Sequence, residues 1–268
     1  MKKVADQDVP RAARTFRRWI IEQSRRSNVG HVASALSIAD IMAVLWGAVM
    51  KAPGTGRPDR DRFILAKGHA ALALYCALRW KKLLDEKTFE TFCGDGSTLG
   101  QHPEHALPGV DLSTGSLGQG LSVGCGLAYG LRARRNPGRV FVLLSDAECN
   151  EGQVWEAAQF AGHHRLANLC AVIDLNGLQA LGHTKDVLDL APMADKWRAF
   201  GWEAVDVDGH DCGALEAALN ADHGRSRMVV ARTVQGKGVS FMENRLEWHY
   251  RNLTDDECAL ALREIGPA

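Results

Sequence analysis

The sequence predicts an α/β fold, with a doubly wound, mostly parallel sheet that carries helices on both of its faces. The first observation is that short apolar runs, typical of buried strands, alternate along the chain with longer segments of helical periodicity. The second is the unit from Val140 to Asn176, in which apolar runs at residues 140–144 and 169–175 flank a helical segment. This spacing is that of a minimal βαβ crossover, which joins two parallel strands.

The first third of the chain is expected to supply helices joined by loops and a connector. Residues 11–26 place apolar side chains on one helical face and arginines elsewhere, which predicts an amphipathic helix. Ser37 is followed three residues later by Asp40, and this pair predicts a capping box that opens a second helix, ending near Met50. A Pro- and Gly-rich connector follows at residues 51–62, and residues 63–66 lead into Lys67-Gly68-His69. Residues 70–84, rich in Ala and Leu, are expected to be helical.

The rest of the chain continues the alternation. Turn-forming residues dominate residues 85–113, and the glycine-marked segment 114–120 leads into an apolar helix of small residues. Beyond the central unit, strands are expected at residues 202–207 and 228–234, a helix at 214–221 and a short helix from about residue 255. Because the sequence has no internal repeat and no clear linker, we expect a single domain over residues 1–268.

Composition and charge exclude some classes of function. Lys+Arg and Asp+Glu both number 32, so nothing in the charge indicates nucleic acid or an anionic membrane as a partner. The longest uncharged apolar stretch, residues 121–131, is far shorter than the roughly 20 residues of a membrane helix. No apolar run follows the N-terminal lysines, so no signal peptide is expected. The seven cysteines form no CxxC pair, which favours reduced thiols and a cytoplasmic location.

Two polar residues at the ends of predicted strands indicate a cation site. Asp146 and Asn176 close the two strands of the central unit, and ligands of open parallel sheets bind beyond the carboxyl ends of the strands. One carboxylate and one carboxamide can hold a hard cation, and because Mg²⁺ usually keeps water and phosphate oxygens, this pair implies a phosphorylated ligand. Glu151 and Gly152 begin the helix between the strands, and its open N-terminus suits an anion.

Four histidines lie in loops of similar composition. Each sits on or beside a loop that contains glycine, and they are His31, His69, His102 and His249. A single histidine of this kind is commonly structural, but four in similar loops indicate a shared site. Neutral imidazoles can bind diphosphate or sugar hydroxyls and can move protons near pH 7.

The chain resembles the N-terminal, diphosphate-binding half of transketolase along essentially its whole length. The motifs that carry the resemblance occur in the order and approximate spacing of the family. They are Gly30-His31, Lys67-Gly68-His69, Gly100-Gln101-His102-Pro103-Glu104, Thr114 to Gly120, Ser145-Asp146-Ala147 with Glu151-Gly152 and Asn176, and Gly236-Lys237-Gly238 with Trp248-His249. The resemblance implies a thiamine diphosphate-binding fold of the diphosphate-binding type, with Mg²⁺ or Ca²⁺. It also implies transfer of a two-carbon ketol unit from a ketose, phosphorylated or not, to an aldose.

The resemblance further implies roles for particular residues. The implied metal ligands are the side chains of Asp146 and Asn176 and the carbonyl of Leu178. The implied cofactor-binding residues are His69, Gly115, Leu117, Asp146, Ala147, Glu151, Asn176 and His249. The implied catalytic residues are His31, His69, His102, His249 and Glu151. Among these, His31 and His102 are expected on the sugar hydroxyls, and Glu151 in a carboxylate network that crosses to another subunit.

Two departures from the family pattern affect these expectations. Ser145 and Ala147 stand where glycines usually flank the metal-binding Asp, and both are small enough that the site is expected to survive. The sequence ends at Ala268, whereas a full-length transketolase continues into a pyrimidine-binding domain and a C-terminal domain. We therefore expect a split enzyme, in which a separate subunit supplies the other half, as an α2β2 heterotetramer.

Two alternatives stay open on the sequence. One is a subunit of another thiamine diphosphate enzyme, such as the α subunit of an α-ketoacid dehydrogenase, although the resemblance assigns the motifs around His102 and His249 to sugar-handling members. The other is a non-catalytic scaffold subunit that has kept the fold, which the intact ligand types at Asp146 and Asn176 oppose. The donor sugar, the acceptor sugar and the pathway are not determined by these residues.

Overall fold

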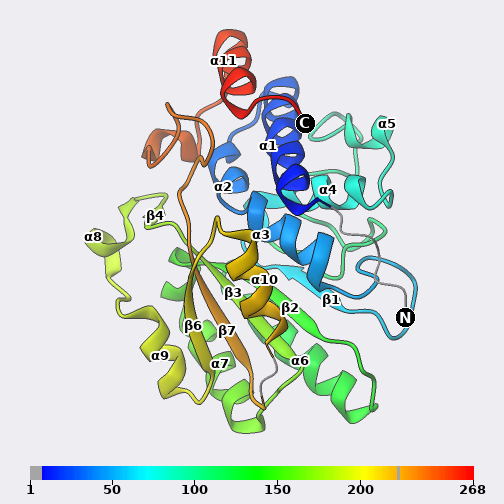
Figure 1. Cartoon of the computed structure of the whole chain (residues 1–268), viewed down its shortest axis with the longest axis vertical. Helices are drawn as coiled ribbons and strands as arrows, with labels where there is room; N and C mark the ends of the chain where they lie inside the picture. Colours follow the sequence, from blue (N-terminus) through cyan, green and yellow to red (C-terminus); the bar gives the residue numbers. More distant parts are fainter. Residues whose placement is uncertain (1–7, 222–223) are drawn as a thin grey trace.

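The structure is a computed structural model that describes residues 8–221 and 224–268, and a parallel sheet lies at its centre (Figure 1). Within these residues the sheet has five strands in the order β1-β2-β3-β7-β6, and every neighbouring pair is parallel. The strands are β1 (Arg62–Leu65), β2 (Val140–Ser145), β3 (Leu169–Leu175), β6 (Glu203–Asp208) and β7 (Arg227–Arg232). A small antiparallel pair, β4 (Leu178–Gln179) and β5 (Gly182–His183), follows β3. The prediction of a mostly parallel sheet is confirmed.

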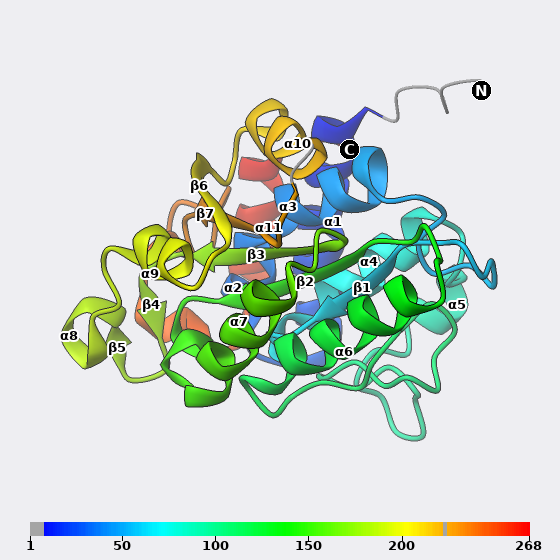
Figure 2. The same cartoon turned by 90° about the horizontal axis from the view of Figure 1, so that it is seen from below.

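Helices cover both faces of the sheet, so the doubly wound arrangement is also confirmed (Figures 1 and 2). Alternate strand residues enter two separate cores, because Phe141 and Leu143 of β2 face one core whereas Val142 and Leu144 face the other. The first core is covered by α1 (Val9–Ser27), α2 (Val32–Ser37), α3 (Ala39–Val44), α4 (Ala71–Trp80), α10 (Cys212–Asn220) and α11 (Asp255–Ile265). The second is covered by α6 (Gln119–Ala133), α7 (Gly152–His164) and α9 (Met193–Ala199).

Short elements connect these layers. They are the π-helical turn η1 (Leu45–Val49), the 3₁₀ turns η2 (Gly68–Ala70), η3 (Ala147–Asn150) and η4 (Leu246–His249), and the helices α5 (Glu86–Phe89) and α8 (Thr184–Leu188). Among them, η2, η3, α8 and η4 come after strands in the chain order. Three of these turns carry predicted site residues, because His69 lies in η2, Ala147 begins η3 and His249 ends η4.

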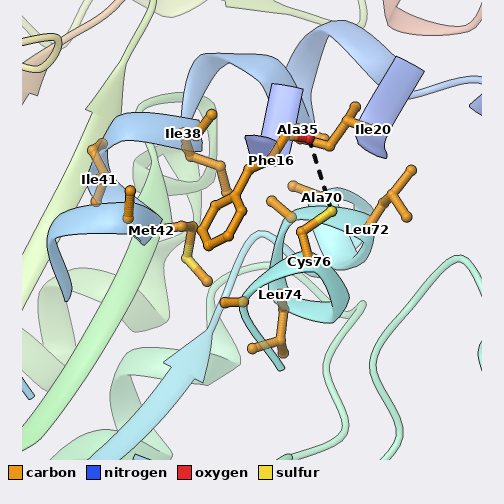
Figure 3. Packing of buried hydrophobic residues seen from close by; sticks show 14 of the residues in the cluster. Phe16, Ile20, Ala35, Ile38, Ile41, Met42, Ala70, Leu72, Leu74 and Cys76 are labelled. Atoms are coloured by element: carbon orange, nitrogen blue, oxygen red, sulfur yellow. Dashed lines mark hydrogen bonds between the residues drawn. The ribbon is translucent and has the colours of Figure 1, made fainter. Parts of the chain in front are cut away.

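The layer formed by α1, α3 and α4 is packed around Phe16 (Figure 3). Phe16 of α1 is fully buried and lies beside Met42 of α3, and its carbonyl oxygen accepts a hydrogen bond from the Sγ of Cys76 of α4 at 3.9 Å. Burial of an aromatic side chain stabilises a fold by roughly 1.5–3 kcal/mol. This packing fixes the starts of α2 and α4, where His31 and His69 lie.

The predicted capping box at Ser37 and Asp40 is wrong. Helix α2 already ends at Ser37, whose hydroxyl donates to the carboxylate of Asp174 instead of capping α3. Asp40 forms an ion pair with Arg17 and accepts a hydrogen bond from His210. Both Ser37 and Asp40 are buried, so tertiary partners replace the local backbone partners that a cap at an exposed helix end would use.

Most of the other predicted elements are confirmed with shifted ends. The helix predicted at residues 70–84 ends at Trp80, and the strand predicted at 228–234 spans 227–232. The turn-rich stretch 85–113 contains the short helix α5, and α8 was not predicted. Helix α11 begins with a true capping box, in which the side chains of Thr254 and Glu257 bond to each other's backbone amides.

Two further sequence-based expectations can be compared with the structure. All seven cysteines are free thiols, as the absence of a CxxC pair predicted. Among the described helices, none combines the length and the apolarity that crossing a membrane requires. The expectation that no signal peptide is present concerns a segment whose first residues, 1–7, lie outside the described part of the chain.

Candidate active site

A cavity of about 350 Å³ opens at the carboxyl ends of the central strands, and loops from distant parts of the sequence line it. The predicted site residues on its wall are His31, His69, His102, Gly115, Leu117, Ala147, Glu151, Asn176, Leu178 and His249. Asp146 lines an adjoining cavity of about 610 Å³, which shares Asn150 and Asn176 with the first. The structure therefore brings the sequence-predicted residues to one place, with Asp146 in the wall between two cavities.

Three of the four histidines form a cluster. The ring centroids of His31, His69 and His249 lie 5.2 to 5.7 Å from one another. The backbone of His31 adopts a left-handed conformation, and its amide donates to the carbonyl of His249 at 3.0 Å. The preceding Gly30 is required here, because a Cβ at this position would lie 2.4 Å from the carbonyl oxygen of Tyr250.

The fourth histidine is positioned by the glycine-marked loop at residues 114–118. Gly115 has φ +154°, and a Cβ on it would lie 3.1 Å from the ring of His102. A Cβ on Gly68 would in turn lie 2.8 Å from Thr114, whose hydroxyl donates to the carbonyl of Leu65. The glycines therefore allow the loop, the His102 ring and the start of η2 to pack in direct contact.

Asp146 and Asn176 occupy the predicted positions, directly beyond β2 and β3. The Asp146 carboxylate accepts backbone N–H groups from Ala147 at 2.8 Å and from Gly177 at 2.7 Å. The side-chain amide nitrogen of Asn176 donates to Asp174 at 2.8 Å. The side-chain oxygen of Asn176 accepts the backbone N–H of Leu178. The two oxygen-bearing side chains therefore flank one loop of backbone.

The Asp146 carboxylate is buried beside another carboxylate, and this disfavours its ionised form. Burial, followed by the negative charge of Asp174, raises the pKa of Asp146 to about 7, and a bound cation would favour the ionised form. Among the described residues no group of three or more His, Cys, Asp or Glu side chains is arranged to hold a metal ion. One carboxylate and one amide suit a cation that takes its other ligands from phosphate and water, as Mg²⁺ does.

A fully buried ion pair lies directly beneath these two residues, and it was not predicted as part of the site. Lys67 Nζ donates to Asp174 at 2.6 Å, and both side chains have no exposed surface. Asp174 also accepts hydrogen bonds from Ser37, Thr233 and Asn176. The available signal was a charged residue inside the apolar run of β3, which a buried strand tolerates only when the charge is paired.

A second buried carboxylate was also missed. Glu148 in η3 is fully buried, and its side chain accepts the backbone N–H of Gly118 at 2.7 Å. Burial raises the pKa of Glu148 to about 7. Glu148 therefore ties the glycine-marked loop to the end of β2, whereas the predicted residue Glu151 is exposed at the start of α7 and does not cap it with its side chain.

The histidines of the cluster are held in the neutral form. Burial lowers the pKa of His69 well below its usual value, with the charges of Lys67 and the other histidines adding to the effect. Burial, then His31 and Lys67, lowers the pKa of His249 to about 4, and burial also lowers the pKa of His31. Neutral rings near pH 7 can accept a hydrogen bond or a proton from a bound sugar.

We expect the neutral form of His249 to produce a defined pH dependence of stability. The unfolded chain takes up this proton near pH 6.5 and the folded chain only near pH 4, so the unfolded state binds more protons between these values. The stability of the wild type relative to His249→Gln should therefore rise with pH over this window, reach its full value above about pH 6.5 and be lost as pH falls.

Urea unfolding of wild type and variant at about pH 4.5 and about pH 7.5 measures this difference, and His183→Gln, at an exposed position in β5, is the matched control. A constant difference between wild type and His249→Gln would contradict the lowered pKa.

Several polar atoms in the cavity wall lack a partner. The buried atoms without a hydrogen bond include Asn150 Oδ1, Gln179 Nε2 and Gln235 Oε1, and all three residues line the 350 Å³ cavity. Leaving such an atom unsatisfied costs about 1–3 kcal/mol, so a ligand that offers donors and acceptors would relieve this cost. Together with the Asp146 and Asn176 oxygens and the open N-terminus of α7, this wall fits a phosphorylated polar ligand with a divalent cation.

Comparison with known proteins matches the chain to a described family. The family described as transketolase, thiamine diphosphate binding domain, matches residues 9–267. The chain is 38% identical over 265 residues to a 6-deoxy-6-sulfo-D-fructose transketolase subunit of Clostridium sp. (strain MSTE9), covering 96% of each chain. It is 36% identical to an apulose-4-phosphate transketolase subunit of Actinobacillus succinogenes, again covering 96% of each chain.

Longer transketolases match the chain over part of their length. Human transketolase is 36% identical over 253 residues, which cover 91% of this chain and 40% of that protein. The solved structure of transketolase from Leishmania mexicana has a TM-score of 0.88 at 28% identity, covering 96% of this chain and 41% of that one. The chain thus has the length of the named subunits and about two fifths of the length of these longer proteins.

Proposed function

Since the chain belongs to the transketolase family, as its thiamine diphosphate-binding part, we propose that it is one subunit of a two-chain transketolase. In this proposal the assembled enzyme transfers a two-carbon ketol unit from a ketose to an aldose, and this chain contributes half of the active site. Relatives of the same length are named as transketolase subunits, which supports this function over the α-ketoacid dehydrogenase and scaffold alternatives. These relatives are named for different ketoses, so the proposal names no single sugar.

The observation that carries the proposal is the convergence of the predicted residues at one sheet edge. Loops that are up to about two hundred residues apart in the sequence bring the His31, His69 and His249 rings within 5.7 Å of one another. The same cavity is bordered by Asn176 and the glycine-marked loop. A non-catalytic scaffold has no need for four histidines and a cation site in one cavity.

The cofactor in this proposal is thiamine diphosphate with a divalent cation, Mg²⁺ or Ca²⁺. When bound, it supplies the electron sink for cleavage of the carbon–carbon bond. Asp146 and Asn176 would hold the cation through their side chains and Leu178 through its carbonyl. The remaining proposed cofactor contacts are His69, Gly115, Leu117, Ala147, Glu151 and His249.

The residues of this chain would bind the sugar and move its protons. His69 and His249 are neutral at pH 7, so each can accept a proton from a sugar hydroxyl and return it. His31 is oriented by a contact of 3.0 Å between its Nδ1 and the side-chain amide of Gln101. In this orientation the His31 ring would form hydrogen bonds to sugar hydroxyls. His102 would also bind sugar hydroxyls. Glu151, exposed beside the cavity, would reach the carboxylate network of another subunit.

The partner in this proposal is a subunit that carries the pyrimidine-binding half, in an α2β2 heterotetramer. Exposed apolar side chains close in sequence to cavity-lining residues support such a contact, because Leu181, which follows Ala180, is 79% exposed, and Leu246, three residues before His249, is exposed as well. We also propose that the chain is a single domain over residues 1–268 and acts in the cytoplasm, and the free thiols support this location.

Mixing the chain with its partner subunit tests the function. We expect two-carbon transfer from a panel of ketoses and ketose phosphates to an aldose when both subunits, thiamine diphosphate and Mg²⁺ are present, and none from the chain alone. The variant Leu181→Asp should prevent assembly in sedimentation experiments, because a buried unpaired charge is costly. Leu260→Asp, on the exposed side of α11, is the matched control and should assemble normally.

Two outcomes would contradict the proposal. Robust turnover by the chain alone would remove the need for a partner. A complex that assembles but transfers nothing with any ketose, while accepting a 2-oxo acid such as pyruvate, would favour the dehydrogenase alternative.

A further inference from the structure

Tyr250 lies at the mouth of the cavity, outside the set of residues proposed above to hold the cofactor or the sugar. It directly follows His249 and lines the cavity, yet 61% of its surface is exposed. The rings of His31 and His249 stand edge-on to its ring, with centroids 5.3 and 4.6 Å away. Tyr250 thus extends the histidine cluster toward the solvent with an aromatic face and a hydroxyl.

The backbone beneath Tyr250 is held in place. The carbonyl of Tyr250 packs against Gly30 so closely that a Cβ on the glycine would lie 2.4 Å from its oxygen. The neighbouring His249 carbonyl accepts the His31 amide at 3.0 Å. A side chain on such a fixed base binds with little loss of conformational entropy, as a tyrosine with two rotatable bonds allows.

The charge of the cavity wall indicates what Tyr250 can recognise. Among the described residues that line the cavity, Lys67 is the only Lys or Arg, and its ammonium group is fully buried against Asp174. Apart from the Glu151 carboxylate, the wall therefore offers a bound sugar neutral hydrogen-bonding groups and no free cation among the described lining residues. A tyrosine complements such a wall, because its ring packs on C–H bonds and its hydroxyl both donates and accepts.

We propose that Tyr250 is a specificity-determining residue that contacts the part of the sugar chain farthest from the transferred two-carbon unit. Its ring packs on the carbon chain of a long aldose acceptor, and its hydroxyl bonds to a hydroxyl of that acceptor. A two-carbon aldose lacks the distal carbons and hydroxyls that these contacts need. This inference rests on the proposed transketolase function.

The test uses the complete complex with one ketose donor and aldose acceptors of two to six carbons. For Tyr250→Phe we expect the KM of the longer acceptors to rise about fivefold, and for Tyr250→Ala about tenfold or more, with little change in kcat. The KM of the two-carbon acceptor should stay as in the wild type. Tyr129→Phe and Tyr129→Ala, at an exposed tyrosine of α6, are the matched controls and should change nothing.

Each other outcome has a definite meaning. An equal change for all acceptors, a loss of kcat alone or unchanged KM values would overturn the inference about Tyr250. Weaker assembly of the Tyr250 variants in sedimentation, with unchanged acceptor preference, would overturn it too and assign the residue to the contact between subunits. A wild-type complex without any transfer would instead contradict the proposed function, so the two failures are distinguishable.

Discussion

Replacing Asp174 by alanine is expected to lower the free energy of unfolding by about 3–5 kcal/mol, the usual cost of breaking a buried ion pair. The Lys67 ammonium group would lose the carboxylate that pairs with it in the described part of the chain while still excluded from water, and Ser37, Thr233 and Asn176 would lose an acceptor. Urea unfolding of the isolated chain measures the change.

A double variant separates the charge from the geometry. Lys67→Met with Asp174→Leu removes both charges, and it should recover part of the lost stability because an apolar pair of similar size avoids the cost of burying ions, although Ser37, Thr233 and Asn176 still lack their acceptor. The double variant should not restore the orientation of Asn176 in the cation site, because the Asn176 amide still lacks the acceptor that orients it. If the double variant is as unstable as Asp174→Ala, the two residues do not act as a unit.

The residues around this buried pair also show where prediction from the sequence succeeds. The strand ends at Asp146 and Asn176 could be placed because apolar runs of strand length and a helical segment recur in a pattern that parallel sheets impose. The structure confirms both strand ends and the two-faced sheet. Such periodic signals are local, so a single sequence contains them.

The misses concern partners that are far apart in the sequence. The motif around Ser37 has the form of a capping box, but the hydroxyl meets Asp174 from another element, 137 residues away. In the sequence Glu148 looks like an ordinary acidic residue near the start of a helix. Only the folded structure shows that its carboxylate accepts the backbone N–H of Gly118. Tyr250 borders the site only because the fold brings Gly30 and His31 beside it. Local patterns do not contain these contacts, because tertiary structure creates them.

Replacing Asp146 by asparagine is expected to lower two-carbon transfer by the assembled complex by at least about a hundredfold, since loss of residues that merely orient metal ligands already costs 10–100-fold. The variant keeps the size of the side chain and removes the charge that would face the cation. The complex should still assemble, because Asp146 is 2% exposed and does not lie on the surface. Asp186→Asn, an exposed carboxylate of α8, is the matched control and should keep full activity.

A second measurement on the same variant does not depend on turnover. Without ligands, Asp146→Asn should change the free energy of unfolding by no more than about 1–3 kcal/mol, because removing a buried charge offsets the loss of one of its two backbone hydrogen bonds, which the amide nitrogen cannot accept. At a ligand concentration of one hundred times Kd, thiamine diphosphate with Mg²⁺ should stabilise the wild-type complex by about 2.7 kcal/mol. A hundredfold weaker site would gain only about 0.4 kcal/mol under the same conditions. Equal stabilisation of the two complexes, with transfer unchanged, would instead show that Asp146 is not the cation ligand and would make the scaffold alternative the better account of this chain.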